Sequence, residues 1–167
     1  MNLYIMNKNF FIATALVASA MSITSCRDDD ETATIQTLNP AEILSSVNEW
    51  KTTIVKVEAT GEDVTNLNLG VVGLASYKMD GTYEIKSMNG VLRNSGNYAI
   101  TPDGKRRILN ATTVYNANGE IISGATFTRV TDITTINKDK FTYRISGVAS
   151  AGGPNNVNVL VEHVPNK

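Results

Sequence analysis

The chain has 167 residues, 42% of them hydrophobic, and carries 15 basic and 16 acidic side chains, one cysteine and one histidine. This length suits one ordinary domain with appendages, and the balanced charge argues against a nucleic-acid binder, which needs a basic surplus. The single cysteine excludes a disulfide framework and a cysteine-rich zinc site, and the single histidine excludes a two-histidine metal motif. We therefore expect no cofactor and no metal.

Residues 1–25 have the pattern of a signal peptide and not of a folded segment. Lys8 gives a basic start, and an uncharged apolar run of about 14 residues follows at 10–23. This run is shorter than the ~20 residues that a transmembrane helix needs, so it favours a leader over a membrane span.

The leader ends at residues 23–26, which read Ile-Thr-Ser-Cys. This segment resembles the bacterial lipobox, in which a cysteine after two small residues receives a diacylglyceryl group and becomes the new N-terminus. The resemblance implies that Cys26 is a lipid attachment site and that the membrane is a partner of the protein. Several acyl chains on one residue meet the requirement for stable anchoring. The alternative is a chance cysteine after an apolar run.

Four acidic residues, Asp28, Asp29, Asp30 and Glu31, follow the cysteine almost directly. They resemble the export signal that sends lipoproteins of certain Gram-negative bacteria to the cell surface. The resemblance implies a lipid-anchored outer-membrane protein exposed on the surface, with residues 26–39 as a lipidated acidic tether. The alternatives are an ordinary solvated charge run and retention on the periplasmic leaflet.

A short helix is expected to open the domain, which we assign to residues 40–167. Residues 39–42 read Asn-Pro-Ala-Glu, which places an N-cap, a proline at N1 and a glutamate at N3. The spacing of the apolar residues that follow predicts a helix of about ten residues. Those residues are Ile43, Leu44, Val47 and Trp50.

The remaining chain reads as short strands joined by tight turns. Asp80-Gly81 between two strand-like runs is a strong hairpin signal. Val157, Val159 and Val161 share one face opposite Asn158 and Glu162, as in a half-buried strand. We predict an all-β fold, an up-and-down antiparallel barrel of about eight strands with a short N-terminal helix. A two-sheet sandwich is the alternative. The expected strands are 51–57, 69–79, 82–87, 97–101, 105–115, 121–131 with a longer or broken run to 136, 141–147 and 157–164.

A helix followed by a tryptophan at the head of the first strand resembles the calycin plan of lipocalin-like barrels. The resemblance implies that Trp50 plugs one end of the barrel, although Asn48-Glu49-Trp50 replaces the Gly-x-Trp of lipocalins. The chain is more similar to a family of small bacterial lipoprotein domains of unknown function. This similarity implies a fold and a cellular location but no chemical activity. The motifs that carry this similarity are Trp50, 61–65, 73–77, 81–84, 101–109, 138–144 and 161–165.

Tyrosines are the candidate ligand-binding residues of the barrel. An eight-stranded barrel is just wide enough to be filled by side chains or to hold one small ligand. Tyrosine has an apolar body and a polar tip and therefore suits the wall of such a cavity. The alternative is that these side chains fill the core or cover the outer face. The candidates are Tyr77, Tyr83, Tyr98 and Tyr143.

The sequence contains no credible catalytic constellation. His163 shares a strand face with Val157, Val159 and Val161 and is expected to be a rim or core histidine before it is a base. The basic cluster at 105–107, Lys-Arg-Arg, follows a Pro-Asp-Gly turn, so we interpret it as a solvated hairpin end with charges on both sheet faces and not as a phosphate site. We therefore expect no enzyme.

These observations support two functional hypotheses. The first is a monomeric surface lipoprotein whose barrel binds a small apolar or amphipathic ligand. The second is a structural or protein-interaction module of the envelope, with a filled barrel and no ligand. A tyrosine-lined cavity of roughly 300 Å3 or more favours the first, and a packed interior favours the second.

Overall fold

The computed structural model describes residues 38–148 and 157–167. The predicted signal peptide, Cys26 and the acidic residues after it lie outside these ranges. The elements are α1 (Pro40–Ser46), β1 (Trp50–Val57), the 3-10 turn η1 (Thr65–Leu67), β2 (Leu74–Tyr77), β3 (Thr82–Lys86), β4 (Leu92–Ile100), β5 (Arg106–Val114), β6 (Phe127–Ile136), β7 (Phe141–Val148) and β8 (Val157–Pro165).

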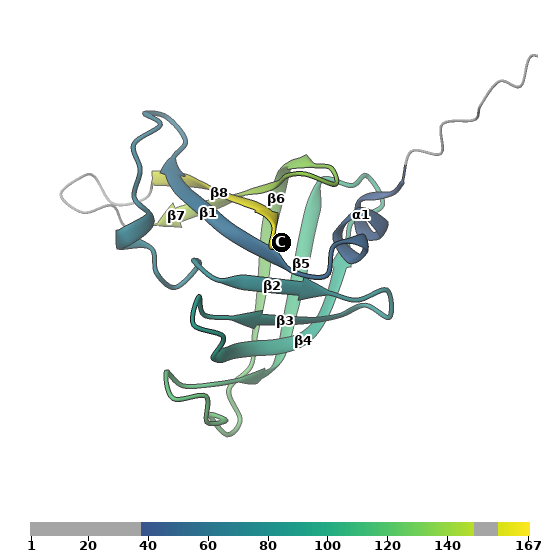
Figure 1. The fold of residues 1–167 in the computed structure, drawn as a ribbon, viewed down its shortest axis with the longest axis vertical. Helices are drawn as coiled ribbons and strands as arrows, with labels where there is room; N and C mark the ends of the chain where they lie inside the picture. The colour runs from purple at the N-terminus through teal and green to yellow at the C-terminus, as the bar shows by residue number, and fades with distance from the viewer. Residues whose placement is uncertain (1–37, 149–156) are drawn as a thin grey trace, which may run out of the picture. The chain divides into compact units, whose positions relative to one another are not determined.

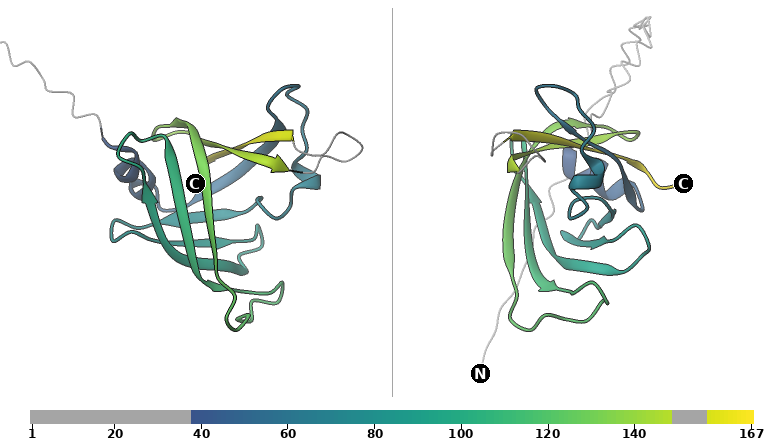
Figure 2. Two further views of the ribbon diagram at one scale, coloured as in Figure 1. Left: turned by 180° about the vertical axis from the view of Figure 1, so that it is seen from behind. Right: turned by 90° about the vertical axis from the view of Figure 1, so that its left-hand side faces the viewer.

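The eight strands form one closed antiparallel barrel in chain order (Figures 1 and 2). Each strand pairs with the next one along the chain, and β8 returns to pair with β1 and closes the sheet. This confirms the predicted all-β, up-and-down barrel and excludes the two-sheet sandwich. Closure gives every strand a hydrogen-bonded neighbour on each side. The largest fully buried side chains of the core include Trp50, Leu44, Phe141 and Val161.

The helix α1 begins where its capping residues predict. The Asn39 side chain accepts a hydrogen bond from the Glu42 amide at 2.9 Å, and the Glu42 carboxylate accepts one from the Asn39 amide at 2.9 Å. The helix is seven residues long and not about ten, because Val47 adopts an extended backbone with φ −102° and ψ 123°. This early end lets the chain turn into β1 at Trp50.

Three strands differ from their expected bounds by more than one residue at an end. The strand predicted to start at residue 69 starts at Leu74, and turns occupy residues 69–71. The strand predicted from 97 begins five residues earlier, at Leu92. The strand predicted over 121–131 runs instead from Phe127 to Ile136, because Gly124 takes a positive φ of 72° and residues 121–126 belong to a loop.

The junction between β1 and β2 is much shorter than the other seams of the barrel. Only two residue pairs join these strands, against seven pairs between β1 and β8. Beyond the ladder, the amide of Thr52 donates to the carbonyl of Gly73 at 2.9 Å, and the amide of Gly73 donates to the Thr52 hydroxyl at 3.1 Å. The side chain of Thr52 therefore continues the hydrogen bonding between the two segments beyond the last ladder pair of β1 and β2.

No helix in the described part of the chain is both long and apolar enough to cross a membrane.

Candidate functional site

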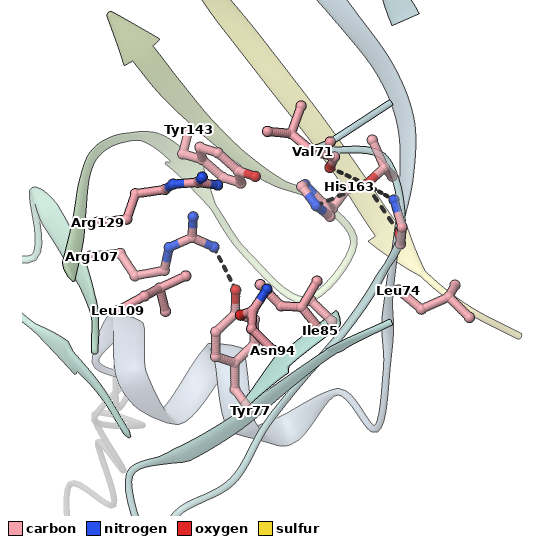
Figure 3. A pocket seen from close by; sticks show the side chains of 14 residues that line it. Val71, Leu74, Tyr77, Ile85, Asn94, Arg107, Leu109, Arg129, Tyr143 and His163 are labelled. Atoms are coloured by element: carbon pink, nitrogen blue, oxygen red, sulfur yellow. Dashed lines mark hydrogen bonds between the residues drawn. The ribbon is translucent and has the colours of Figure 1, made fainter. Parts of the chain in front are cut away.

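The barrel interior contains a small cavity of about 30 Å3 beside the β1–β2 junction. This volume has room for about one or two water molecules. Its wall combines apolar side chains with a group of polar ones that reach it from different strands (Figure 3). The polar residues of the wall are Thr52, Tyr77, Asn94, Arg107, Arg129, Tyr143 and His163.

Arg107 is the most unusual residue of this wall, because its side chain is charged and only 2% exposed. Its Nη1 donates a short hydrogen bond to the hydroxyl of Tyr77. Its guanidinium carbon lies 4.0 Å from the ring centroid of Tyr143 and 5.3 Å from that of Phe141. Stacking on aromatic faces stabilises a guanidinium that has lost part of its water shell.

The burial of Arg107 corrects the interpretation of residues 105–107 as a solvated hairpin end. The expected splaying to both sheet faces is present, because Arg106 points outward, with a side chain 63% exposed, and approaches Asp132 at 3.3 Å. Arg107 alternates to the inner face with Leu109 and Ala111, which are both buried. The cluster therefore divides between solvent and the barrel interior.

His163 is a core histidine, 3% exposed on the inner face of β8. Its Nε2 lies 3.1 Å from the hydroxyl of Thr52, and its ring stacks on that of Tyr143 with centroids 5.3 Å apart. Burial and, to a lesser degree, the nearby positive charge of Arg107 lower the pKa of His163 to about 3. The imidazole is therefore neutral at physiological pH.

The neutral, buried His163 predicts a specific pH dependence of stability. Between about pH 6.5 and 3 the imidazole takes up a proton in the unfolded chain only, so its contribution is complete above pH 6.5 and falls by about 1.4 kcal/mol per pH unit as the pH decreases. The difference in free energy of unfolding between the wild type and His163→Gln should therefore fall by about 1.4 kcal/mol per pH unit over this range. Urea unfolding of both proteins from pH 7.5 to 4.5 measures it. Parallel stability curves would contradict the buried neutral state.

The four candidate tyrosines do not all reach the cavity. Tyr77 and Tyr143 line it, whereas Tyr83 and Tyr98 do not. Tyr83 is 1% exposed, and burial raises the pKa of its hydroxyl to about 12. Tyr98 packs edge-on against Tyr77 with ring centroids 5.0 Å apart, and its hydroxyl donates to the carbonyl of Lys78 at 3.0 Å. Their role in binding a ligand stays a prediction.

Trp50 is fully buried where α1 meets the barrel. Its indole Nε1 donates to the carbonyl of Leu44 at 3.0 Å, and its ring meets that of Phe141 edge-on at a centroid distance of 5.9 Å. The hydrogen bond satisfies a carbonyl of α1, and the ring joins the helix to the interior of the barrel. The role of Trp50 as a barrel plug stays a prediction.

Sequence reasoning missed Thr52, Asn94, Arg107 and Arg129 as members of one wall. For Arg107 a signal was present, since counting by twos from Leu109 and Ala111 places it inward. Ile108 is equally apolar and sits on the opposite face, so the pattern alone did not decide between the two faces. The other three residues carry no such signal, because β1, β4 and β6 meet only in the closed barrel.

The described residues offer no acid–base pair or metal centre. No group of three or more His, Cys, Asp or Glu side chains gathers within them. No aspartate or glutamate is among their buried residues, so His163 has no buried carboxylate beside it. The wall of the cavity therefore supplies cationic and neutral hydrogen-bonding groups but no carboxylate base.

A family model described as a domain of unknown function (DUF4822) matches residues 41–167 of the chain. No curated protein matches the chain. Among solved structures, insecticyanin from the tobacco hornworm Manduca sexta is similar with a TM-score of 0.46 and 15% identity, over 77% of this chain and 66% of that chain. The chain thus spans just under two thirds of the length of insecticyanin.

Proposed function

The chain belongs to the DUF4822 family of domains of unknown function, and from that premise we propose that it is a lipid-anchored envelope protein whose filled barrel is a non-enzymatic protein-interaction module. This membership confirms the family resemblance that the sequence motifs indicated. The observation that carries the proposal is the size of the cavity, about 30 Å3. Pockets for organic ligands usually measure about 300–1,000 Å3, so an apolar ligand has no room inside.

The outer surface supports the interaction role at the end of the barrel opposite α1. The loops β1–β2, β3–β4 and β5–β6 all lie at this end (Figure 1). We call it the loop end. Five large apolar side chains in these loops are between 45% and 66% exposed. Exposed apolar side chains on the loops of one end are candidates for a protein contact site. They are Leu67, Leu69, Met88, Ile121 and Ile122.

The anchor is proposed from the sequence alone. Cys26 would carry the lipid, and the acidic residues after it would direct the protein to the cell surface of a Gram-negative bacterium. In the sequence the tether directly precedes α1, and the loop end is the end of the barrel opposite α1. A protein partner in the envelope would meet that end.

Cys26→Ser is expected to move the protein from the membrane fraction to the soluble fraction, because no acyl chain can then be attached. A matched control replaces the four acids, Asp28, Asp29, Asp30 and Glu31, with their amides. We expect this control to stay in the membrane but to become resistant to protease added to intact cells. Membrane-bound Cys26→Ser would contradict the lipid anchor. Cleavage of the amide variant by protease on intact cells would contradict the export role of the acids.

Two further measurements test the interaction module. Native mass spectrometry of protein purified from its own membranes should show no bound apolar or amphipathic molecule in the barrel. A photo-crosslinking residue at position 121 should form discrete crosslinks in intact cells, whereas the same residue at position 79 should not. Met79 is a suitable control because it is 81% exposed but lies in the β2–β3 turn, away from the loop end. Equal crosslinking at both positions would contradict the proposal.

A further inference from the structure

Two guanidinium groups face the same small cavity without a carboxylate to neutralise them. Arg107 of β5 and Arg129 of β6 both line it (Figure 3). Within residues 38–148 and 157–167, no ion pair joins either of them to an acidic side chain. The outward-facing Arg106 and Arg144 differ in this respect, because Asp132 and Glu58 pair with them.

Arg107 also has hydrogen-bonding capacity that nothing in the described structure uses. Its Nε–H is buried and has no partner. Tyr77 accepts the bond from Arg107 Nη1, so its own hydroxyl proton remains available as a donor. The buried Oδ1 of Asn94 also has no partner, and exchanging the amide oxygen and nitrogen by a 180° turn would present a donor in its place.

A buried cation of this kind needs a compensating negative charge. Arginine keeps its proton at any physiological pH, and buried charges in proteins are almost always paired. The aromatic rings of Tyr143 and Phe141 offset part of the loss of water, but they leave the Nε–H unsatisfied. His163 is neutral and adds no negative charge.

We propose that the cavity is a binding site for a small monovalent anion of about the size of a carboxylate group. Arg107 and Tyr77 would hold the anion from inside the barrel, and Arg129 would close on it from the exposed side of the wall. The volume of about 30 Å3 admits a halide ion or a single carboxylate group. This site is independent of the protein-interaction function proposed above.

The test uses the full-length protein with formate and chloride as probes. The ionic strength is held constant with sodium sulfate, whose anion is divalent and larger than formate or chloride. Wild type should show a saturable rise of Tm with formate or chloride, since a ligand that binds only the folded state stabilises it. The NMR signal of the Arg107 Nε–H should shift over the same concentration range. A wild type that responds to neither probe overturns the proposal.

Matched variants assign the response to the interior of the barrel. Arg107→Met should weaken binding by more than about tenfold, because it removes the buried partner of the charge. Arg106→Met removes the same charge from the outer face one residue away and should bind like wild type. Should Arg107→Met fail to fold, Arg129→Met tests the site from its exposed side, with an expected weakening of about two- to fivefold. Unchanged binding by Arg107→Met, or by Arg129→Met where it is the only folded variant, overturns the proposal.

Octanoate distinguishes a free small anion from the carboxylate end of a larger molecule. Binding of formate as tight as octanoate identifies a free anion as the occupant. Octanoate binding at least about tenfold tighter than formate, as burial of its alkyl chain would give, identifies an amphipathic carboxylate. That second result supports the anion site but contradicts the filled barrel of the proposed function, so the two proposals fail separately.

Discussion

Gly96→Ala is expected to lower the free energy of unfolding by about 3 kcal/mol or more. A Cβ atom at position 96 would lie 2.0 Å from the carbonyl oxygen of Asn110 and 2.9 Å from the amide nitrogen of Thr112, both in the backbone of β5. No rotamer change relieves a clash with backbone atoms, so the β4–β5 ladder must separate. The ladder also shifts register between Ser95 and Gly96, at the position of this close contact.

Gly70→Ala provides the matched control for this prediction. An added Cβ at position 70 meets nothing within 4 Å, and Gly70 has no positive φ. We expect a change between zero and a stabilisation of about 1 kcal/mol, because alanine restricts the unfolded chain. Urea unfolding followed by far-UV circular dichroism measures both variants. Equal stability of the two variants would contradict the close approach of β4 and β5.

Trp50→Ala is expected to lower the free energy of unfolding by about 3–5 kcal/mol. The substitution leaves a large void between α1 and Phe141, and it removes the donor that satisfies the carbonyl of Leu44. Trp50→Phe separates these two contributions, because it retains an aromatic ring but leaves the carbonyl unpaired, at a cost of about 1–3 kcal/mol. Thermal unfolding and urea titration give both values.

Met79→Ala is the control for the tryptophan variants. Met79 is 81% exposed, so its truncation should change stability by less than about 0.5 kcal/mol. A loss for Trp50→Ala as small as that of Met79→Ala would show that the tryptophan does not join the helix to the core. A loss for Trp50→Phe equal to that of Trp50→Ala would assign the whole effect to the indole hydrogen bond.

The barrel was predictable because its signals are local. The asparagine cap at 39, the Asp80-Gly81 turn and the alternation over 157–162 each depend on a few neighbouring residues, and short turns between successive strands imply an up-and-down order. The late start of β2 was not predictable in this way. Val71 and Val72 suit a strand, but the seam to β1 gives way there to hydrogen bonds between Thr52 and Gly73.

The cavity could not be predicted, because its wall depends on contacts between strands that are distant in the chain. Arg107 and Tyr77 are 30 residues apart, and Thr52 and His163 are 111 residues apart. The tyrosine content alone left open whether these side chains line a ligand cavity or fill the core. In the structure Tyr77 and Tyr143 flank the buried side chain of Arg107, which occupies part of the interior.

The pairing of β1 with β8 has a consequence for how the protein folds. The ladder joins the first and last strands of the barrel, so it must close the longest loop that the domain allows. Such non-local contacts place barrels among slow folders, with times of about milliseconds to seconds. A chain that lacks residues 157–165 would expose unpaired edges on both β1 and β7, which invite association with other chains. The nine residues of β8 therefore cover the edges of both the first and the seventh strand.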